Sequence, residues 1–179
     1  MSNMQAWKQN IGSLIDYAER IFPEVEIVSR ALTGEIVKSN YGQVAKRAKK
    51  LGSSLESYGI EHGQNVGSLA LNTYRNMEMY YGISGMGAVM HTINFRLHPE
   101  QIAYIINHAE NRLIFLETVF APLLEALQDN CPTVEKYILL CSKEEMPETK
   151  LKNVISYEEF IEDGDESYSW PELDEDAPC

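Results

Sequence analysis

The chain has 179 residues, enough for one domain with a buried core or for a large part of one. Its 44% apolar and 23% charged residues are typical of a globular protein and exclude a disordered or collagen-like chain. The net charge of −12 lies mostly at the end, because residues 1–142 carry 14 acids and 12 bases whereas residues 143–179 carry 13 acids and 3 bases. Without a basic stripe, no nucleic-acid partner is expected, and we expect the acidic end to be solvated.

The first 59 residues predict a helix, a hairpin and a second helix. Residues 4–22 are expected to be helical up to Pro23. Two strand-like runs, 24–32 and 35–39, flank a Thr-Gly pair and predict a β-hairpin. A second helix is expected to begin at Asn40, which is placed to cap it, and to end at Gly59.

From residue 65 onward, strand-like and helix-like runs alternate. Four compact apolar runs are predicted as strands: 65–71, 88–94, 112–117 and 135–141. Helices are expected between them, over 73–87, over 98–110 and from Pro122. Alternation implies parallel pairing with right-handed crossovers. The predicted fold class is α/β, a doubly wound and mostly parallel sheet with helices on both faces, preceded by a helix and a short β-hairpin.

The last part of the chain is less regular. Residues 142–153 read as a polar loop, and Ser156 to Glu159 form a capping-box pattern that predicts a short helix. Acids and prolines dominate from Gly164. We therefore assign residues 1–165 to the folded unit and residues 166–179 to an acidic connector.

Cysteine usage and the start of the chain predict a cytoplasmic location. Cys131, Cys141 and Cys179 are odd in number and fit no metal-binding spacing, so we expect reduced thiols. The chain begins without a basic and apolar leader, so no signal peptide is expected. No apolar run approaches the ~20 residues of a transmembrane segment.

The glycine-rich run GISGMG, residues 82–87, has the wrong glycine order for a dinucleotide-binding loop and closes a helix instead of opening one. We expect these small residues to let that helix lie close to the sheet. Four histidines, His62, His91, His98 and His108, lack the i, i+4 spacing of a helical zinc pair, so no metal site is expected. His91 could serve as an acid–base group, but a strand-end histidine with a backbone partner is the favoured interpretation.

The loop 92–97 follows a predicted strand, at the end of the sheet where ligands usually bind. Asn94 and Arg96 could reach a ligand or a partner chain. The favoured interpretation is that Asn94 fixes the turn and that Arg96 pairs with a nearby carboxylate, because a single loop is thin evidence for a site.

Two stretches carry a family resemblance. "NTYRNMEMYYGISGMGAVMHTINFRLHPEQIAYIINHAENRLIFLE" (72–117) and "YGQVAKRAKKLGSSLESYGIEHGQNVGSLALN" (41–72) resemble the amino-terminal subdomain of AMP-forming acyl-CoA synthetases, and most of all the medium- and long-chain fatty-acid–CoA ligases. The resemblance extends over roughly residues 20–165. It implies that residues 1–165 are an incomplete amino-terminal subdomain and that 166–179 would lead into the phosphate loop of the family.

The motifs that carry the chemistry of that family do not occur in this sequence: the Ser/Thr/Gly-rich phosphate loop, the adenine-binding segment, the hinge and the adenylation lysine. The resemblance implies a parent enzyme that uses ATP, Mg²⁺ and coenzyme A to convert a fatty acid to acyl-CoA, AMP and pyrophosphate through an acyl-adenylate. No catalytic, cofactor-binding or metal-binding residue is assigned to this chain, which is expected to be inactive and to bind no cofactor by itself.

Two alternatives remain open. The chain could be a stand-alone interaction module that kept the fold, or its parent enzyme could act on an aryl or another small carboxylic acid. The expected partners are the remainder of a ligase chain, whose fatty acid is the substrate of the complete enzyme, and a second copy in a homodimer. A group of apolar side chains is expected to face the missing neighbours: Met77, Tyr80, Tyr81, Met86, Met90 and Phe95.

Overall fold

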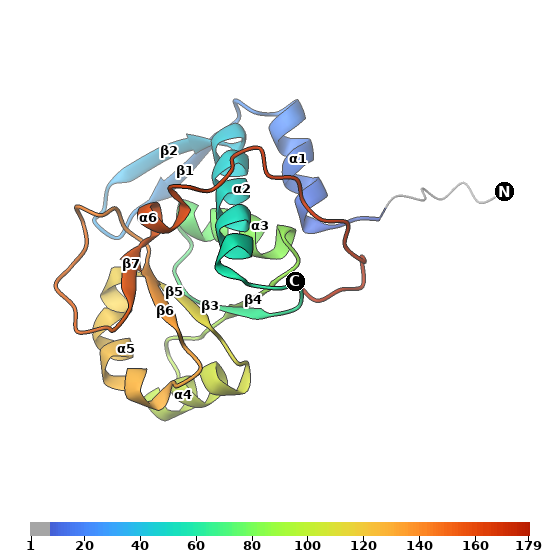
Figure 1. Cartoon of the computed structure of the whole chain (residues 1–179). Coiled ribbons are helices and arrows are strands. Elements are labelled where there is room, and N and C mark those ends of the chain that lie inside the picture. The colour runs from blue at the N-terminus through green and yellow to red at the C-terminus, as the bar shows by residue number, and fades with distance from the viewer. Residues whose placement is uncertain (1–7) are drawn as a thin grey trace.

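The computed structural model describes residues 8–179, which form a layered α/β unit with the first helix and a hairpin at one end (Figure 1). Helix α1 spans Ile11–Ile21, a shorter helix than expected. It begins after Asn10 because the Asn10 side chain accepts a hydrogen bond from the Ser13 N–H at 2.8 Å. Residues 8–10 are therefore not helical, and residues 4–7 of the expected helix lie outside the described part.

The predicted hairpin and second helix are confirmed. Strands β1 (Glu26–Arg30) and β2 (Ile36–Asn40) pair antiparallel. Helix α2 (Tyr41–Tyr58) follows directly, and the Asn40 side chain accepts the Gln43 N–H at 2.8 Å. Gly59 ends it in the left-handed conformation (φ 90°), which costs glycine little.

The central sheet has five parallel strands in the order β4-β3-β5-β6-β7. These strands are β3 (Asn65–Leu69), β4 (Val89–Thr92), β5 (Leu113–Leu116), β6 (Lys136–Leu139) and β7 (Val154–Ser156). The first four confirm the expected strands, whereas β7 was missed. Its three residues are too few to show a period, and pairing with β6 (Tyr137 opposite Val154) defines it.

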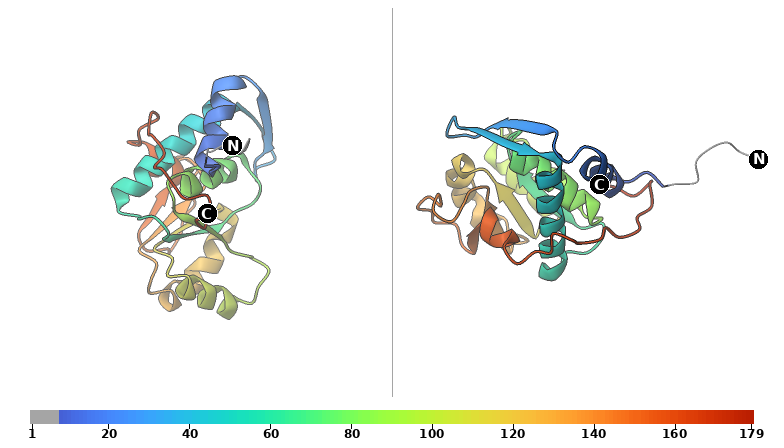
Figure 2. Two further views of the ribbon diagram at one scale, coloured as in Figure 1. Left: turned by 90° about the vertical axis from the view of Figure 1, so that its right-hand side faces the viewer. Right: turned by 90° about the horizontal axis from the view of Figure 1, so that it is seen from above.

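Helices cover both faces of the sheet, as predicted (Figures 1 and 2). They are α3 (Tyr74–Gly85), α4 (Pro99–His108), α5 (Ala121–Leu127), α6 (Tyr157–Ile161) and the short 3₁₀ turns Thr118–Phe120 and Gln128–Asn130. One core lies between the sheet and α2, α3 and α6, and contains Leu51, Met79 and Phe115. The other core contains Ile102 and Leu124, from α4 and α5. None of the helices in residues 8–179 combines the length and apolarity needed to span a bilayer.

The glycines of α3 pack against helices and not against the sheet, which corrects the expectation for residues 82–87. A Cβ at Gly82 would lie 2.8 Å from a Leu51 methyl carbon and 2.9 Å from the Ala48 carbonyl oxygen, both on α2. The absence of a side chain at Gly82 thus sets the close approach of α2 and α3.

The acidic end of the chain is anchored by one aromatic side chain, although it was expected to be a solvated connector. It runs across α2 and α1 (Figure 1). The Trp170 ring packs against three glycines on three helices, where an added Cβ would come within 2.7 Å at Gly12 and 2.9 Å at Gly52 and Gly85. The Trp170 Nε1–H also donates to Asp16 Oδ1 at 3.1 Å. The segment is exposed on both sides of this anchor.

Candidate functional site

A cavity of about 190 Å³ lies at the carboxyl ends of three neighbouring strands, below the turn of the β1–β2 hairpin. Parallel α/β sheets usually bind ligands at this edge. Thr73 and Arg75 reach it after β3, Glu117 follows β5, and Cys141 and Glu145 follow β6. The cavity is therefore the first place to look for chemistry in this chain.

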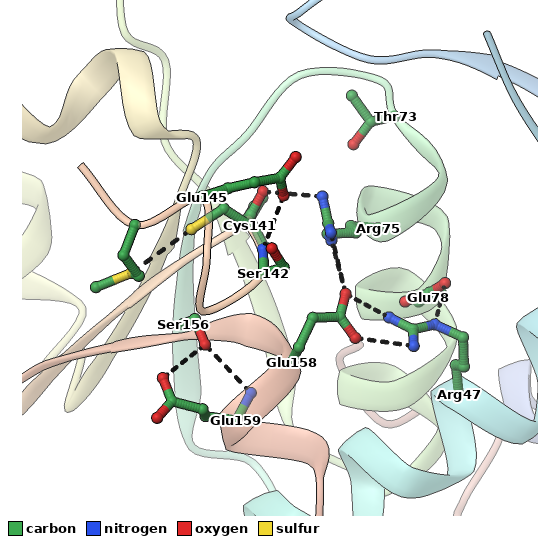
Figure 3. Close-up of polar contacts among 12 residues, drawn as sticks. Arg47, Thr73, Arg75, Glu78, Cys141, Ser142, Glu145, Ser156, Glu158 and Glu159 are labelled. Atoms are coloured by element: carbon green, nitrogen blue, oxygen red, sulfur yellow. Dashed lines mark hydrogen bonds and ion pairs between the residues drawn. The ribbon is translucent and has the colours of Figure 1, made fainter. Parts of the chain in front are cut away.

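Beside the cavity, two arginines and two glutamates form a connected ion network (Figure 3). Arg47 Nε on α2 donates to Glu78 Oε1 on α3 at 2.7 Å, and its Nη1 and Nη2 donate to the two Glu158 oxygens at 3.0 Å each. Arg75 Nε and Nη2 donate to Glu158 Oε1 at 3.1 and 3.0 Å. Arg75 Nη1 donates to the Leu140 carbonyl oxygen at 3.1 Å, next to the end of β6. The network thus ties α2, α3, α6 and β6 together.

Burial sets the electrostatics of this network. Glu78 is fully buried, and burial raises its pKa although Arg47 opposes the shift. Burial alone would lower the pKa of Arg47, but the adjacent carboxylates of Glu78 and Glu158 outweigh it and raise that pKa. Tyr157, also fully buried, has its pKa raised well above the ordinary value, first by burial and then by Glu78. Its hydroxyl and Glu78 Oε2 make no hydrogen bond with any described residue.

The other polar groups of the cavity are held by neighbours. Glu117 is 4% exposed and accepts a hydrogen bond from Thr73 Oγ1 at 3.3 Å, and burial raises its pKa. Burial raises the pKa of the Cys141 thiol to about 11, so the thiolate that would act as a nucleophile is scarce at neutral pH. The three cysteines are free, as expected.

The groups present do not fit a nucleotide triphosphate with magnesium. The guanidinium groups of Arg47 and Arg75 are already bound to carboxylates and to a backbone carbonyl, so neither is left to neutralise a phosphate. Between residues 8 and 179, no three His, Cys, Asp or Glu side chains come together in a way that could hold a metal ion. The arrangement can lock helices to the sheet, and it offers no acid–base pair or nucleophile.

The histidines lie apart from one another. His91 on β4 contacts the Asn111 side chain (Nδ1 to Nδ2, 2.8 Å) and not a backbone group, which corrects the expectation. The Asn111 Nδ2 also donates to the Ile106 carbonyl oxygen at 3.2 Å, which fixes it as the nitrogen. His91 Nδ1 is therefore the acceptor of this hydrogen bond, and the imidazole is neutral with its hydrogen on Nε2.

His98 precedes α4 instead of lying within it as expected, and its N–H donates to Gln101 Oε1 at 3.1 Å. His108 stacks on Tyr104 with ring centroids 5.6 Å apart, and His62 lies in a turn as predicted. None of these contacts indicates catalysis.

The loop after β4 behaves as the favoured interpretation predicts in one respect only. Asn94 Oδ1 accepts the Arg96 N–H at 3.0 Å and so fixes the turn. Arg96 has no carboxylate partner among residues 8–179, and its guanidinium lies 5.3 Å from the centre of the Phe95 ring. A cation–π contact with the adjacent residue replaces the expected ion pair.

Sequence reasoning missed the groups that the structure brings together. The rule that drew attention to Asn94 and Arg96, a position after a strand, applies equally to Arg75 and Glu117. Arg47 and Glu158, 111 positions apart, meet only through the tertiary fold. No local pattern in the sequence links them.

A family model described as "AMP-binding enzyme" matches residues 20–178. The chain belongs to the AMP-binding enzyme family. The resemblance that the sequence suggested is thereby confirmed, and so is the α/β fold.

Two relatives show which branch of the AMP-binding enzymes is similar. The 3-methylmercaptopropionyl-CoA ligase of Ruegeria pomeroyi is 41% identical over 92% of this chain and 31% of its own length. The medium-chain-fatty-acid–CoA ligase of Ectopseudomonas oleovorans is 38% identical over 92% of this chain and 30% of its own length. The chain thus spans less than a third of the length of these curated relatives.

The solved structure of an anthranilate CoA ligase, AuaEII, in complex with anthranoyl-AMP is similar in fold. It superposes with a TM-score of 0.82 over 98% of this chain and 31% of that chain. At 19% sequence identity, this likeness concerns the fold alone.

Proposed function

We propose that this chain is the amino-terminal part of a fatty-acid–CoA ligase and that it is inactive alone. The complete enzyme converts ATP, a fatty acid and coenzyme A to acyl-CoA, AMP and pyrophosphate through an acyl-adenylate. The observation that carries the proposal is the 38–41% identity to acyl-CoA ligases over 92% of this chain but under a third of theirs. The engaged guanidinium groups of Arg47 and Arg75 support the lack of activity.

Within this proposal, residues 1–165 are an incomplete amino-terminal subdomain and residues 166–179 are the connector to the next part of the enzyme. The Trp170 anchor supports this division, because it fixes the path of the connector over α1, α2 and α3. ATP, Mg²⁺ and coenzyme A belong to the complete enzyme, and this chain supplies the scaffold beside them.

A second candidate keeps the reaction but changes the acid. One relative is named for 3-methylmercaptopropionyl-CoA, and the solved structure of similar fold is an anthranilate CoA ligase. A small or aryl carboxylic acid is therefore the alternative substrate class. The stand-alone interaction module is the alternative without catalysis.

The lack of activity is tested by ATP–pyrophosphate exchange with purified residues 1–179, using fatty, short and aryl acids in turn. We expect no exchange above a heat-treated control, since no group in residues 8–179 is free to bind a triphosphate. Exchange that magnesium chelation abolishes would contradict the proposal. Adding the residues of the Ectopseudomonas oleovorans ligase that this chain does not match, as a separate polypeptide, is expected to restore exchange with the correct acid.

A further inference from the structure

One edge of the central sheet is open, and an apolar groove lies along it. Strand β4 is the edge strand and pairs only with β3. The Val89 N–H donates to the Gln64 carbonyl oxygen at 2.9 Å, and the Ile93 N–H donates to the Ser68 carbonyl oxygen at 2.8 Å. Because alternate residues of an edge strand face opposite sides, the peptide groups of Met90 and Thr92 point to the open side.

Met90 and Thr92 also line a groove of about 420 Å³. Its other walls come from α3, with Met77 and Tyr80, and from β1, with Val28. Tyr80 is 43% exposed and Val28 is 58% exposed. Unpaired strand groups next to exposed apolar side chains are the features that accept an additional strand.

The lining of the groove indicates the chemistry of its occupant. In a chain with a net charge of −12, none of the residues that line the groove is Asp, Glu, Lys or Arg. An uncharged segment with apolar side chains is therefore the complementary partner. Met86 was expected in this surface but is buried at 1% exposure, so the surface is narrower than the sequence suggested.

We propose that an extended segment, from the part of the ligase that this chain does not span, pairs with β4 as a sixth strand and places its apolar side chains in the groove. This inference rests on the proposed function, because relatives at 38–41% identity are more than three times as long as the matched stretch. The peptide groups of Met90 and Thr92 supply the hydrogen bonds, and Val28, Met77 and Tyr80 contact the side chains of the added strand.

Amide hydrogen exchange tests the pairing. Residues 20–178 replace the matching stretch of the Ectopseudomonas oleovorans ligase, and exchange is compared between this chimera and the isolated chain. We expect the Met90 and Thr92 amides to exchange rapidly in the isolated chain and on the order of 100-fold more slowly in the chimera. The Val89 and Ile93 amides, which already bond to β3, are the internal controls and are expected to be protected in both. Equal exchange of Met90 and Thr92 in both proteins would overturn the inference.

The same measurement separates other occupants of the groove. Protection that grows with the concentration of the isolated chain would assign the groove to a second copy. Protection on adding a fatty acid alone would assign it to an acyl chain. Either result would overturn the inference. Acyl-CoA formation is not part of the readout, so a folded but inactive chimera with protected amides would uphold the strand pairing and contradict the proposed function.

A copurification experiment covers a chimera that fails to fold. The chain is co-expressed with the unmatched residues of the Ectopseudomonas oleovorans ligase as a separate, tagged polypeptide. We expect the unchanged chain to copurify, and Tyr80→Lys to abolish copurification because it places a charge in the groove. Tyr104→Lys is the matched control, since Tyr104 is 65% exposed on α4, across the sheet from α3. Loss with both variants, with neither, or no copurification of the unchanged chain would overturn the inference.

Discussion

Arg47 Nε on α2 lies 2.7 Å from Oε1 of the fully buried Glu78 on α3. Charges taken out of water are stable only while each remains paired, and a buried carboxylate that loses its partner keeps the full cost of desolvation. This pair therefore holds the two helices in one arrangement, together with the Gly82 contact between them.

Replacing Arg47 with methionine is expected to lower the free energy of unfolding by about 3–5 kcal/mol, because it leaves Glu78 buried without a cation. Adding Glu78→Leu to that variant is expected to recover much of the loss, since no unpaired charge then remains at that position. Urea unfolding measures both effects. Lys46→Met, at an exposed position of the same helix, is the control and is expected to stay within ~0.5 kcal/mol of the unchanged chain. A similar loss for both single variants would contradict the role of the pair.

The Trp170 anchor gives a second prediction. Gly52→Ala would bring a Cβ within 2.9 Å of the Trp170 ring. We expect it to displace the ring into water and to cost about 1–3 kcal/mol by overpacking. Gly42→Ala on the same helix meets its nearest neighbour only at 3.4 Å and is the control.

Tryptophan fluorescence reports on this displacement. The chain has two tryptophans, so the measurement uses a Trp7→Phe background in which Trp170 alone emits. A red shift is expected with Gly52→Ala and not with Gly42→Ala. An unchanged spectrum in both variants would show that the acidic end is not held by the glycine contacts.

Glu117 predicts a pH dependence of stability. Burial raises its pKa above the ordinary 4.5, so the folded protein holds this proton more tightly than the unfolded chain does. The resulting stabilisation is fully present below pH 4.5 and is lost as the pH rises through the folded pKa. Glu117→Gln stays neutral throughout, so its Tm relative to the unchanged chain is expected to increase as the pH rises from 4 to 7, a range of about three units.

Glu125→Gln provides the opposite sign. Hydrogen bonds from Thr149 and from the Lys150 N–H lower the Glu125 pKa, so its contribution is present above pH 4.5 and is lost as the pH falls through the folded pKa. The Tm of Glu125→Gln is expected to fall below that of the unchanged chain near neutral pH and to converge with it in acid. Parallel pH profiles for the two variants would contradict these assignments.

The sequence predicted those parts of the fold that depend on local signals. Asn40 and Gly59 bound α2 as expected, because a cap and a left-handed glycine act within a few residues. Strand β7 and the packing of Gly82 were not predictable in this way. Both depend on what lies opposite in space: β6 for the strand, and α2 for the glycine.

The candidate site was less predictable than the fold for the same reason. Arg75 and Glu117 follow strand ends and could have been selected by that rule. The Arg47–Glu158 contact joins residues far apart in the chain, and only the burial of both helices makes the pair close. Trp170, in an acidic stretch without periodicity, gave no sign that three glycines would receive it.

The measurement that tests the central claim most directly is acyl-CoA formation by the chimera in which residues 20–178 replace the matching stretch of the Ectopseudomonas oleovorans ligase. Product acyl-CoA and AMP are assayed together with ATP, coenzyme A and a medium-chain fatty acid, and circular dichroism verifies folding. If the chain is the amino-terminal part of such a ligase, the folded chimera forms both products in equal amounts, and the isolated chain forms neither. A folded chimera that forms no AMP with fatty, short or aryl acids would contradict the account and favour an interaction module without catalysis.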